Sequence, residues 1–599
     1  MKKQDFIIIS LIIGIFSVFT SCADYLKEEV ISDVGYSYYN TAQGIEAGVG
    51  AAYASLRWAY SGENLHAIQQ LGTDTYQEGQ DGSWKPALNR YENSLNAQLD
   101  LLYQFWENYY KGVSRTNAVL KSIPNVSDMS DDLKKTRSGE IRFLRGLYYF
   151  YLVQTFGKIP LIEDAQYEVK TDFKRSPVAD VYRFILEDLH FAVENLPESQ
   201  SDYGRATKYA AEHLLSLVYL TRGSAVSDQR GQESTDFENA AKYAEDVINS
   251  NRYSLESDFK KLWDIDNQLN KEVIFAVQYS KLLLNNNNAG NKIHLYYTMV
   301  YDESPGMKRD IENGRPWRRV RPTDFTLYQL FDRKNDARFY KTFKTAWLCN
   351  NESNIKKWEE VKDKNGNIIF TPSPELLGKP KMKLGDTAIW VTVERYPENT
   401  NLDALYASRA YDYYPRNRQT NAKFPQNYKF YDNQRASVAE ENGSRDWYLF
   451  RLGETYLIAA EAYGRMGNYE KAVELLNVIR KRAAYKEGES KPTEFLLIEG
   501  GKEEDALKST ESEMLLTVND IKDNFIDFML DERARELNGE CIRKWDLMRA
   551  EKLVERVGKY NPEAVNIREY HKLMPIPQKH IDRLDPKGNI EEEQNEGYY

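Results

Sequence analysis

Histidines are the side chains best suited to acid, base or metal-binding chemistry, and this sequence of 599 residues contains only six of them. No two are spaced as H-x-H or H-x-x-x-H, which would place two imidazoles on one metal ion. The sequence also lacks G-x-S-x-G, a phosphate-binding P-loop and the glycine fingerprint of dinucleotide-binding folds. We therefore expect no catalytic residues, no bound metal and no cofactor.

Carboxylates are the other candidates for catalysis, because the chain has 91 acidic residues. Two carboxyl groups at the right separation suffice for glycoside hydrolysis, and that separation leaves no pattern in a sequence. A surface glycosidase therefore remains an alternative. Some charged residues lie in largely apolar helical segments, where ion pairs between helices explain them better than catalysis, because unpaired buried charge is costly. They are Glu454, Glu461, Arg533, Arg535 and Glu536.

Aromatic residues in segments rich in glycine, asparagine and proline are the best candidates for binding. Trp84 lies in such a segment together with Asp74 and Tyr76, and a second segment contains Tyr296 and Trp317. Flat rings stack on the C–H faces of sugars, and neighbouring polar groups hydrogen-bond their hydroxyls. We predict that these five residues converge on one face as a glycan site, with Asp74 supplying a hydroxyl contact. The alternative is that each ring only fastens its loop to the scaffold.

The first 22 residues have the pattern of a bacterial lipoprotein signal. Lys2 and Lys3 precede an uncharged apolar run at 6–20, which is too short to span a bilayer and has the length of a secretory signal. The run ends at 19–22 (FTSC), which resembles a lipobox with phenylalanine where leucine is usual. We predict cleavage after residue 21 and lipid attachment at Cys22. An ordinary signal peptide with an incidental cysteine is the alternative.

The residues that follow are polar, and 27–29 (KEE) resembles a signal that exports lipoproteins to the cell surface; a solvated tether is the alternative. Loss of residues 1–21 removes two lysines and one aspartate, so the net charge changes from −11 to −12. Such an acidic chain is a poor candidate for binding nucleic acid. Apart from Cys22 the cysteines are Cys349 and Cys541, and the sequence leaves their pairing open.

The elements that must position the candidate residues are mainly helices, because apolar residues recur at helical spacing along most of the chain. In 140–156, apolar residues recur at i, i+3 and i+4, and glycine follows at position 157. Four helix pairs are predicted: 44–60 with 101–123, 140–156 with 177–195, 209–221 with 236–250, and 451–466 with 469–482. The last pair, with Gly467 at its turn, resembles a tetratricopeptide repeat. Between these helices, 61–99 and 281–440 are irregular, with short strands predicted at 273–279 and 388–393.

Several segments together resemble the SusD/RagB family. They are 140–150 (EIRFLRGLYYF), 156–161 (FGKIPL), 272–280 (EVIFAVQYS), 321–323 (RPT), 330–332 (LFD), 336–338 (DAR), 450–457 (FRLGETYL), 532–537 (ERAREL), 544–547 (KWDL), 573–577 (LMPIP) and 594–598 (QNEGY). They follow family order from about residue 22 to the C-terminus. The last differs from the usual QNPGY by glutamate in place of proline.

This resemblance implies an all-α fold with tetratricopeptide-like hairpins, long irregular loops and a few short strands. We expect a signal peptide at 1–21, an N-terminal helical region at 22–225 and a C-terminal region at 226–599. The last would contain the irregular ligand-side segment 281–440 and the helical hairpin 450–482.

The resemblance also implies a non-enzymatic lipoprotein of the outer membrane that faces the cell exterior, as in Bacteroidetes-type bacteria. It would capture a nutrient, most simply an oligosaccharide, for a SusC-like TonB-dependent transporter. In the family, ligand contacts come from the two irregular segments that carry Trp84 and Trp317. Binding of peptides, glycosidase activity and a purely structural role beside the transporter are the alternatives. The sequence does not identify the ligand.

Overall fold

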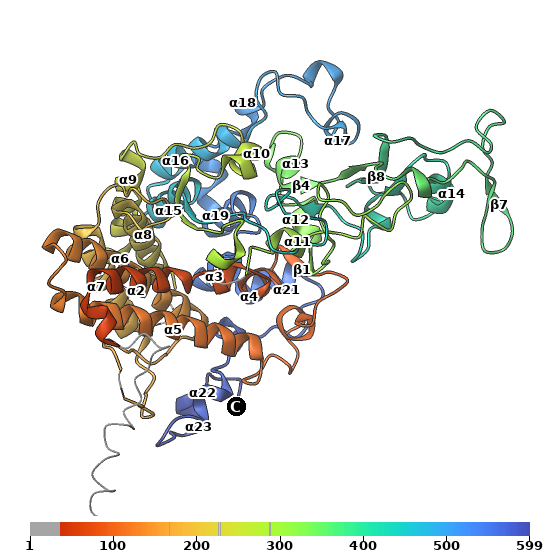
Figure 1. Cartoon of the computed structure of the whole chain (residues 1–599). Coiled ribbons are helices and arrows are strands. Elements are labelled where there is room, and N and C mark those ends of the chain that lie inside the picture. Colours follow the sequence, from red (N-terminus) through yellow and green to blue (C-terminus); the bar gives the residue numbers. More distant parts are fainter. Residues whose placement is uncertain (1–35, 167, 226, 228, 287–288) are drawn as a thin grey trace, which may run out of the picture.

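The computed structural model describes residues 36–166, 168–225, 227, 229–286 and 289–599 (Figure 1). The predicted signal peptide at 1–21, the lipidation site Cys22 and the export segment 27–29 lie outside the described residues. In the described part of the chain, no helix is long and apolar enough to cross a membrane. Cys349 and Cys541 are buried free thiols, so they form no disulfide with each other.

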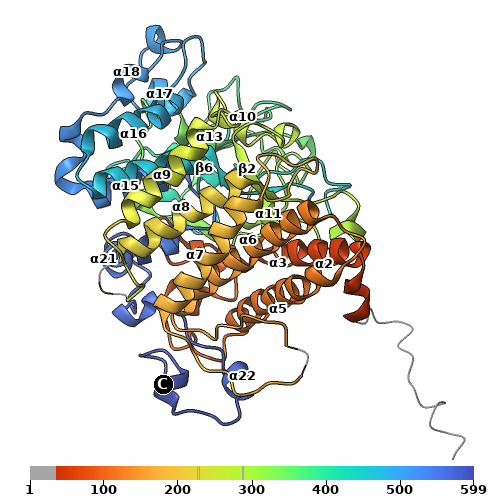
Figure 2. The ribbon, with the colours of Figure 1, turned by 90° about the vertical axis from the view of Figure 1, so that its left-hand side faces the viewer.

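In the described residues, eight long helices form the scaffold and pack as the four predicted pairs, although the helix predicted at 44–60 is divided into α2 (Ala42–Ala54) and a short α3 (Arg57–Tyr60). The pairs are α2 with α5 (Asp100–Ser122), α6 (Asp131–Phe156) with α7 (Val178–Asn195), α8 (Lys208–Ser224) with α9 (Asp236–Asn249), and α15 (Leu452–Arg465) with α16 (Tyr469–Ala483). Successive pairs also touch, through α5 and α6, α7 and α8, and α9 and α15. Figure 2 shows the resulting row of helices from α5 to α16. The prediction of a helical fold with few short strands is confirmed.

The ends of these helices follow from local chemistry. Ser130 caps α6 by accepting a hydrogen bond from Leu133 N at 3.3 Å. Gly157 ends it with a φ of 69°, a conformation that favours glycine. Gly467, with a φ of 82°, forms the turn between α15 and α16, as predicted, and Ala472 on α16 is fully buried.

Buried ion pairs join helices that are far apart in the sequence. Helix α19 (Phe525–Glu536) contributes Arg533, whose guanidinium lies 2.8 Å from both Glu454 of α15 and Asp546 of α20 (Arg543–Arg549). Glu461 of α15 pairs with Arg549 at 2.6 Å. The prediction of ion pairs between helices is confirmed for Glu454, Glu461 and Arg533. It is also confirmed for Glu536, which pairs with Arg482 of α16, but it is wrong for Arg535, whose partner Glu532 lies on the same helix.

The strands in the described part of the chain are all short and lie within or beside the irregular segments. The predicted strand at 273–279 is β2 (Val273–Val277), paired with β11 (Trp447–Arg451), and that at 388–393 is β8 (Thr387–Val391), between β5 (Ala346–Leu348) and β9 (Asp412–Tyr414). The other pairs are β1 (Tyr76–Glu78) with β3 (Val320–Pro322), β4 (Phe343–Lys344) with β10 (Gln426–Asn427), and β6 (Val361–Lys362) with β7 (Ile368–Phe370). Figure 1 shows β8 and β7 on an arm that projects from the helical body.

Candidate functional site

Asp74 is placed in the core, not on a binding face. It is 0% exposed; Arg543 Nε donates to Oδ1 at 2.8 Å and Arg556 Nε donates to Oδ2 at 2.8 Å. Burial by itself would raise the pKa of Asp74, but the two guanidinium groups hold it below its ordinary value. The prediction that Asp74 contacts a ligand hydroxyl is therefore wrong, because its carboxylate is already occupied by two buried arginines.

Tyr76 and Tyr296 are also core residues, 0% and 1% exposed. The Tyr76 hydroxyl donates to Asn538 Oδ1 at 2.5 Å, and its ring lies 5.3 Å from that of Tyr297. Tyr296 packs edge-on against Tyr297 and His66 at 5.2 and 5.7 Å. Because neither ring has a free face, the prediction that these two tyrosines stack on a ligand is wrong as well.

Trp84 and Trp317 remain candidates, because both are half-buried and their segments lie side by side. The pairing of β1 with β3 continues beyond the strands, where Gly79 N donates to Arg319 O at 3.0 Å and Asp81 N donates to Arg318 O at 3.1 Å. Trp84 directly precedes a short helical turn (Lys85–Asn89). The Arg319 guanidinium lies 5.3 Å from the centroid of the Trp317 ring. The structure thus places the segments of two of the five predicted residues, Trp84 and Trp317, side by side.

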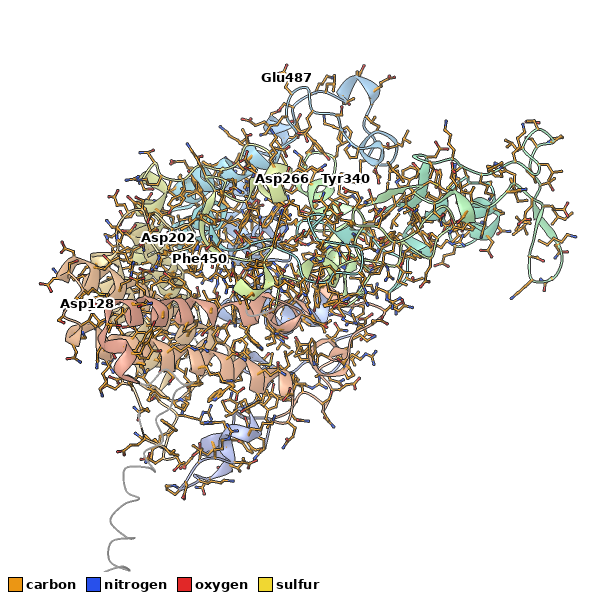
Figure 3. The ribbon with its side chains drawn as sticks, viewed as in Figure 1. Asp128, Asp202, Asp266, Tyr340, Phe450 and Glu487 are labelled. Atoms are coloured by element: carbon orange, nitrogen blue, oxygen red, sulfur yellow. The ribbon has the colours of Figure 1, made fainter. Side chains whose placement is uncertain are left out.

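A pocket that was not predicted from the sequence lies near the base of the arm. Its volume is about 480 Å³, within the range of small-molecule sites. Tyr340, labelled in Figure 3, is one of its lining residues and lies between the helical body and the arm. The lining comes from short elements and loops far apart in the sequence: around α10 (Phe259–Leu262), the end of α13 (Arg338–Thr342), β4, and the segment after β10.

Two stacked tyrosines form one side of this pocket. The rings of Tyr428 and Tyr431 lie 4.4 Å apart with an interplanar angle of 19°, and both side chains are half-buried. The Tyr428 hydroxyl donates to Glu312 O at 3.1 Å, and the Tyr431 hydroxyl donates to Ile311 O. These bonds attach the pocket to the segment that leads, a few residues later, to Trp317. The only signal in the sequence was the position of both tyrosines within the irregular segment 281–440.

Lys344 and Asn313 lie beside the tyrosine pair. Lys344 Nζ donates to Asn313 Oδ1 at 2.7 Å and lies 5.0 Å from the centroid of the Tyr428 ring. Burial lowers the pKa of Lys344 to about 8. The pocket lining therefore combines tyrosine rings, the amide of Asn433 and the ammonium group of Lys344, a combination suited to binding a polar ligand. Among the described residues, no group of three or more His, Cys, Asp or Glu side chains could hold a metal ion.

Comparison with known families gives two matches. A model described as the SusD family matches residues 271–598, more than half of the chain, and one described as starch-binding associating with outer membrane matches residues 42–220. A SusD-like protein of Bacteroides ovatus is 28% identical over 270 residues, 44% of this chain and 48% of its own length, so the chain spans about half of that relative. SusD-like protein P25 of Formosa agariphila is 22% identical over the whole of both chains.

Solved structures show the same architecture. A laminarin-binding SusD-like protein has a TM-score of 0.62 and 22% identity, covering 93% of this chain and 100% of the other. Surface glycan-binding protein A from Bacteroides thetaiotaomicron, solved with laminarihexaose, has a TM-score of 0.62 and 19% identity, covering 93% of this chain and 99% of the other. At these identities the likeness concerns the fold.

Proposed function

Because the chain belongs to the SusD/RagB family, we propose that it is a binding protein that captures an oligosaccharide at the bacterial cell surface. It would be held in the outer membrane by lipid on Cys22 and would deliver its ligand to a SusC-like TonB-dependent transporter. It would act without catalysis. The glycan-binding relatives of the same fold support the choice of a sugar as the ligand.

The observation that carries this proposal is the pocket with the stacked rings of Tyr428 and Tyr431. Trp317 lies on the same segment as Glu312, which also lines the pocket. Half-buried rings in loops offer faces that a sugar can cover, and the polar groups around them can orient its hydroxyls. Trp84, on the segment paired with that of Trp317, would extend the surface for a longer chain.

Titration calorimetry of the purified chain against a panel of oligosaccharides tests the proposal. Removal of one stacking ring, in Trp317→Ala or Tyr431→Ala, should weaken binding about five- to thirty-fold, equivalent to roughly 1–2 kcal/mol. Trp58→Ala is the matched control, because this half-buried tryptophan packs against Phe105 of α5 at 6.1 Å in the helical scaffold. The folded fraction of the Trp58→Ala protein should bind the oligosaccharide with the same affinity as the parent protein.

The same titrations separate the alternatives. Binding of casein-derived peptides in place of every oligosaccharide would favour peptide uptake. Shortening of a bound oligosaccharide over hours would indicate a glycosidase, and the absence of any ligand would leave a structural role. Normal affinity in Trp84→Ala, Trp317→Ala and Tyr431→Ala together would place the glycan site elsewhere.

Anchoring is tested separately. Cys22→Ala should abolish incorporation of radioactive palmitate and release the protein from the outer-membrane fraction. Unchanged labelling of the Cys22→Ala protein would contradict lipidation at this position. Digestion of the wild-type protein by protease added to intact cells would support exposure on the outer surface.

A further inference from the structure

The pocket lined by Tyr428 and Tyr431 has a net charge of opposite sign to that of the whole protein. The chain has a net charge of −11, yet basic residues outnumber acidic ones in the pocket lining. The basic residues are Lys260, Lys341, Lys344, Lys429 and Arg445, and the acidic residues are Asp264 and Glu312.

Two of these cations are neutralised by the protein itself. Lys341 Nζ lies 3.0 Å from Asp258 and 2.6 Å from Glu489. Lys429 Nζ lies 2.6 Å from Glu540. Their role in the pocket is therefore structural, because their charge is already compensated.

Arg445 and Lys344 are different. Arg445 is 3% exposed, and its guanidinium donates to backbone carbonyls, from Nε to Tyr431 O at 2.8 Å and from Nη2 to Trp263 O at 3.0 Å. Lys344 donates to the neutral amide of Asn313 at 2.7 Å. Within the described ranges, the side-chain hydrogen bonds of both residues go to amide or carbonyl oxygens, and no ion pair joins either residue to a carboxylate. Arg445 is thus buried and Lys344 half-buried beside the pocket, and neither has a direct counter-ion. Asp432, Asp264 and Asp446 favour the charged form of Arg445 only at longer range, so an anion in the pocket would stabilise both charges.

Lys344 lines the pocket and can donate further hydrogen bonds to an anion. Its ammonium group has three donors, of which the Asn313 bond uses one. Asp310 and Glu312 favour the charged form at longer range and Lys260 opposes it. Asp310 is itself occupied by Asn313 Nδ2 at 2.9 Å and by Asn350.

The pocket also contains polar atoms that lack a partner. In the described part of the chain, Trp263 Nε1 and Thr342 Oγ1 are buried without a hydrogen bond, and both residues line the pocket. Unsatisfied polar atoms are rare in native interiors and point to a ligand or water that completes them. This observation is independent of the charge and concerns the same pocket.

We infer that the pocket binds an anionic oligosaccharide, with the acid group of the sugar on Lys344 and sugar rings along the Tyr428–Tyr431 pair. This inference rests on the proposed function and narrows its ligand class. A uronate carboxylate and a sulfate ester present the same negatively charged oxygens, so either can fill this role. A sugar is favoured over an acidic peptide because the ammonium lies 5.0 Å from the centroid of the Tyr428 ring, which is stacked on that of Tyr431.

Matched ligands test the inference on the wild-type protein. Oligogalacturonate is compared with its neutral methyl ester, a sulfated carrageenan oligosaccharide with its desulfated form, and laminarihexaose serves as the neutral reference. At least one acidic ligand should bind ten-fold or more tightly than its neutral partner, and the difference should shrink as salt is raised. The pair that shows the difference identifies carboxylate or sulfate as the anion. Equal affinity within both pairs overturns the inference.

Variants then assign the anion to Lys344. Lys344→Met keeps much of the side-chain volume and removes the charge, so it should weaken the acidic ligand at least ten-fold and leave the neutral partner unchanged. Lys344→Arg should restore part of the affinity, and thermal melting checks the fold of both proteins. Lys364→Met on the exposed arm is the control and should change nothing. Unaltered acidic binding in Lys344→Met overturns the assignment.

The two proposals fail in distinguishable ways. Binding of neutral sugars alone contradicts the anionic site and leaves glycan binding intact. If none of the sugars binds, the proposal of glycan binding itself is contradicted. Displacement of a bound oligosaccharide by poly-glutamate peptides at lower concentration would contradict the sugar and favour an acidic peptide.

Discussion

Replacement of Asp74 by asparagine should destabilise the protein strongly and leave its ligand affinity intact. Asparagine keeps the volume of the side chain and removes its charge, so Arg543 and Arg556 lose a shared carboxylate. Arg543 Nη2 lies 2.5 Å from Asp74 Oδ2, and the Arg543 side chain is 4% exposed. The remaining side-chain hydrogen bond of Arg543 goes to the backbone carbonyl of Leu530 at 2.6 Å.

The magnitude follows from this geometry. Removal of one partner from a buried ion pair costs about 3–5 kcal/mol, because the other charge stays buried without compensation. Arg556 keeps Asp527 at 2.9 Å and also Asp531, so most of the cost arises at Arg543. We therefore expect a loss of about 3–4 kcal/mol in the free energy of unfolding.

Urea denaturation at pH 7 measures this loss, and Asp81→Asn is the control. Asp81 lies on the same segment as Asp74 and pairs with Arg318, but its side chain is 40% exposed. Its replacement should therefore lower the free energy of unfolding by less than about 1 kcal/mol. The pKa of Asp74 is lowered in the folded protein, so its contribution is complete above the unfolded pKa of about 3.9 and is lost as the pH falls below it. A cost below about 1 kcal/mol together with lost glycan affinity would refute this reasoning.

Two further predictions concern the scaffold. Ala472→Trp should lower the free energy of unfolding, measured in urea, by roughly 1–3 kcal/mol, because Ala472 is 0% exposed in the hairpin of α15 and α16. An unchanged free energy of unfolding would contradict the close packing of this residue. Burial lowers the pKa of Lys544 to about 7, so the unfolded chain binds more protons between pH 7 and about 10.5, and stability rises with pH in that window. Lys544→Met should therefore stabilise the protein by up to roughly 4 kcal/mol at pH 7 and by little above pH 10.5, and a gain independent of pH in thermal or urea unfolding would disagree.

The helical scaffold could be predicted because its information is local. In α6, Ile141, Leu144 and Tyr148 recur at helical spacing and are fully buried. The capping residue Ser130 and the terminating Gly157 lie at the ends of the same segment. Neighbouring residues alone therefore decide both the buried face and the ends of the helix.

The errors at Tyr76 and Tyr296 arose because loop composition does not determine burial. The glycines on either side of Tyr76, at 72 and 79, indicate turns, and the turn at Gly72 is real, with a φ of 74°. Pairing of β1 with β3 then carries Tyr76 inward, although its strand partner Pro322 is far away in the sequence. Asp74 is a stronger case, because its partner Arg543 is 469 residues away.

The pocket was missed for the same reason, because its lining comes from segments that are far apart in the sequence. The irregular segment leaves the helices after β2 and returns at β11, and these two strands pair with each other. Arg451, at the end of β11, lies 2.9 Å from Glu272 beside β2 and 2.8 Å from both Glu536 and Glu540. The contact of α9 with α15 joins the third and fourth helix pairs directly, and Tyr431 is not part of the main apolar core, to which the inserted segment contributes Tyr296, Tyr297 and Phe430. Changes at Lys344 or Tyr431 should therefore alter ligand choice with little effect on the helical core.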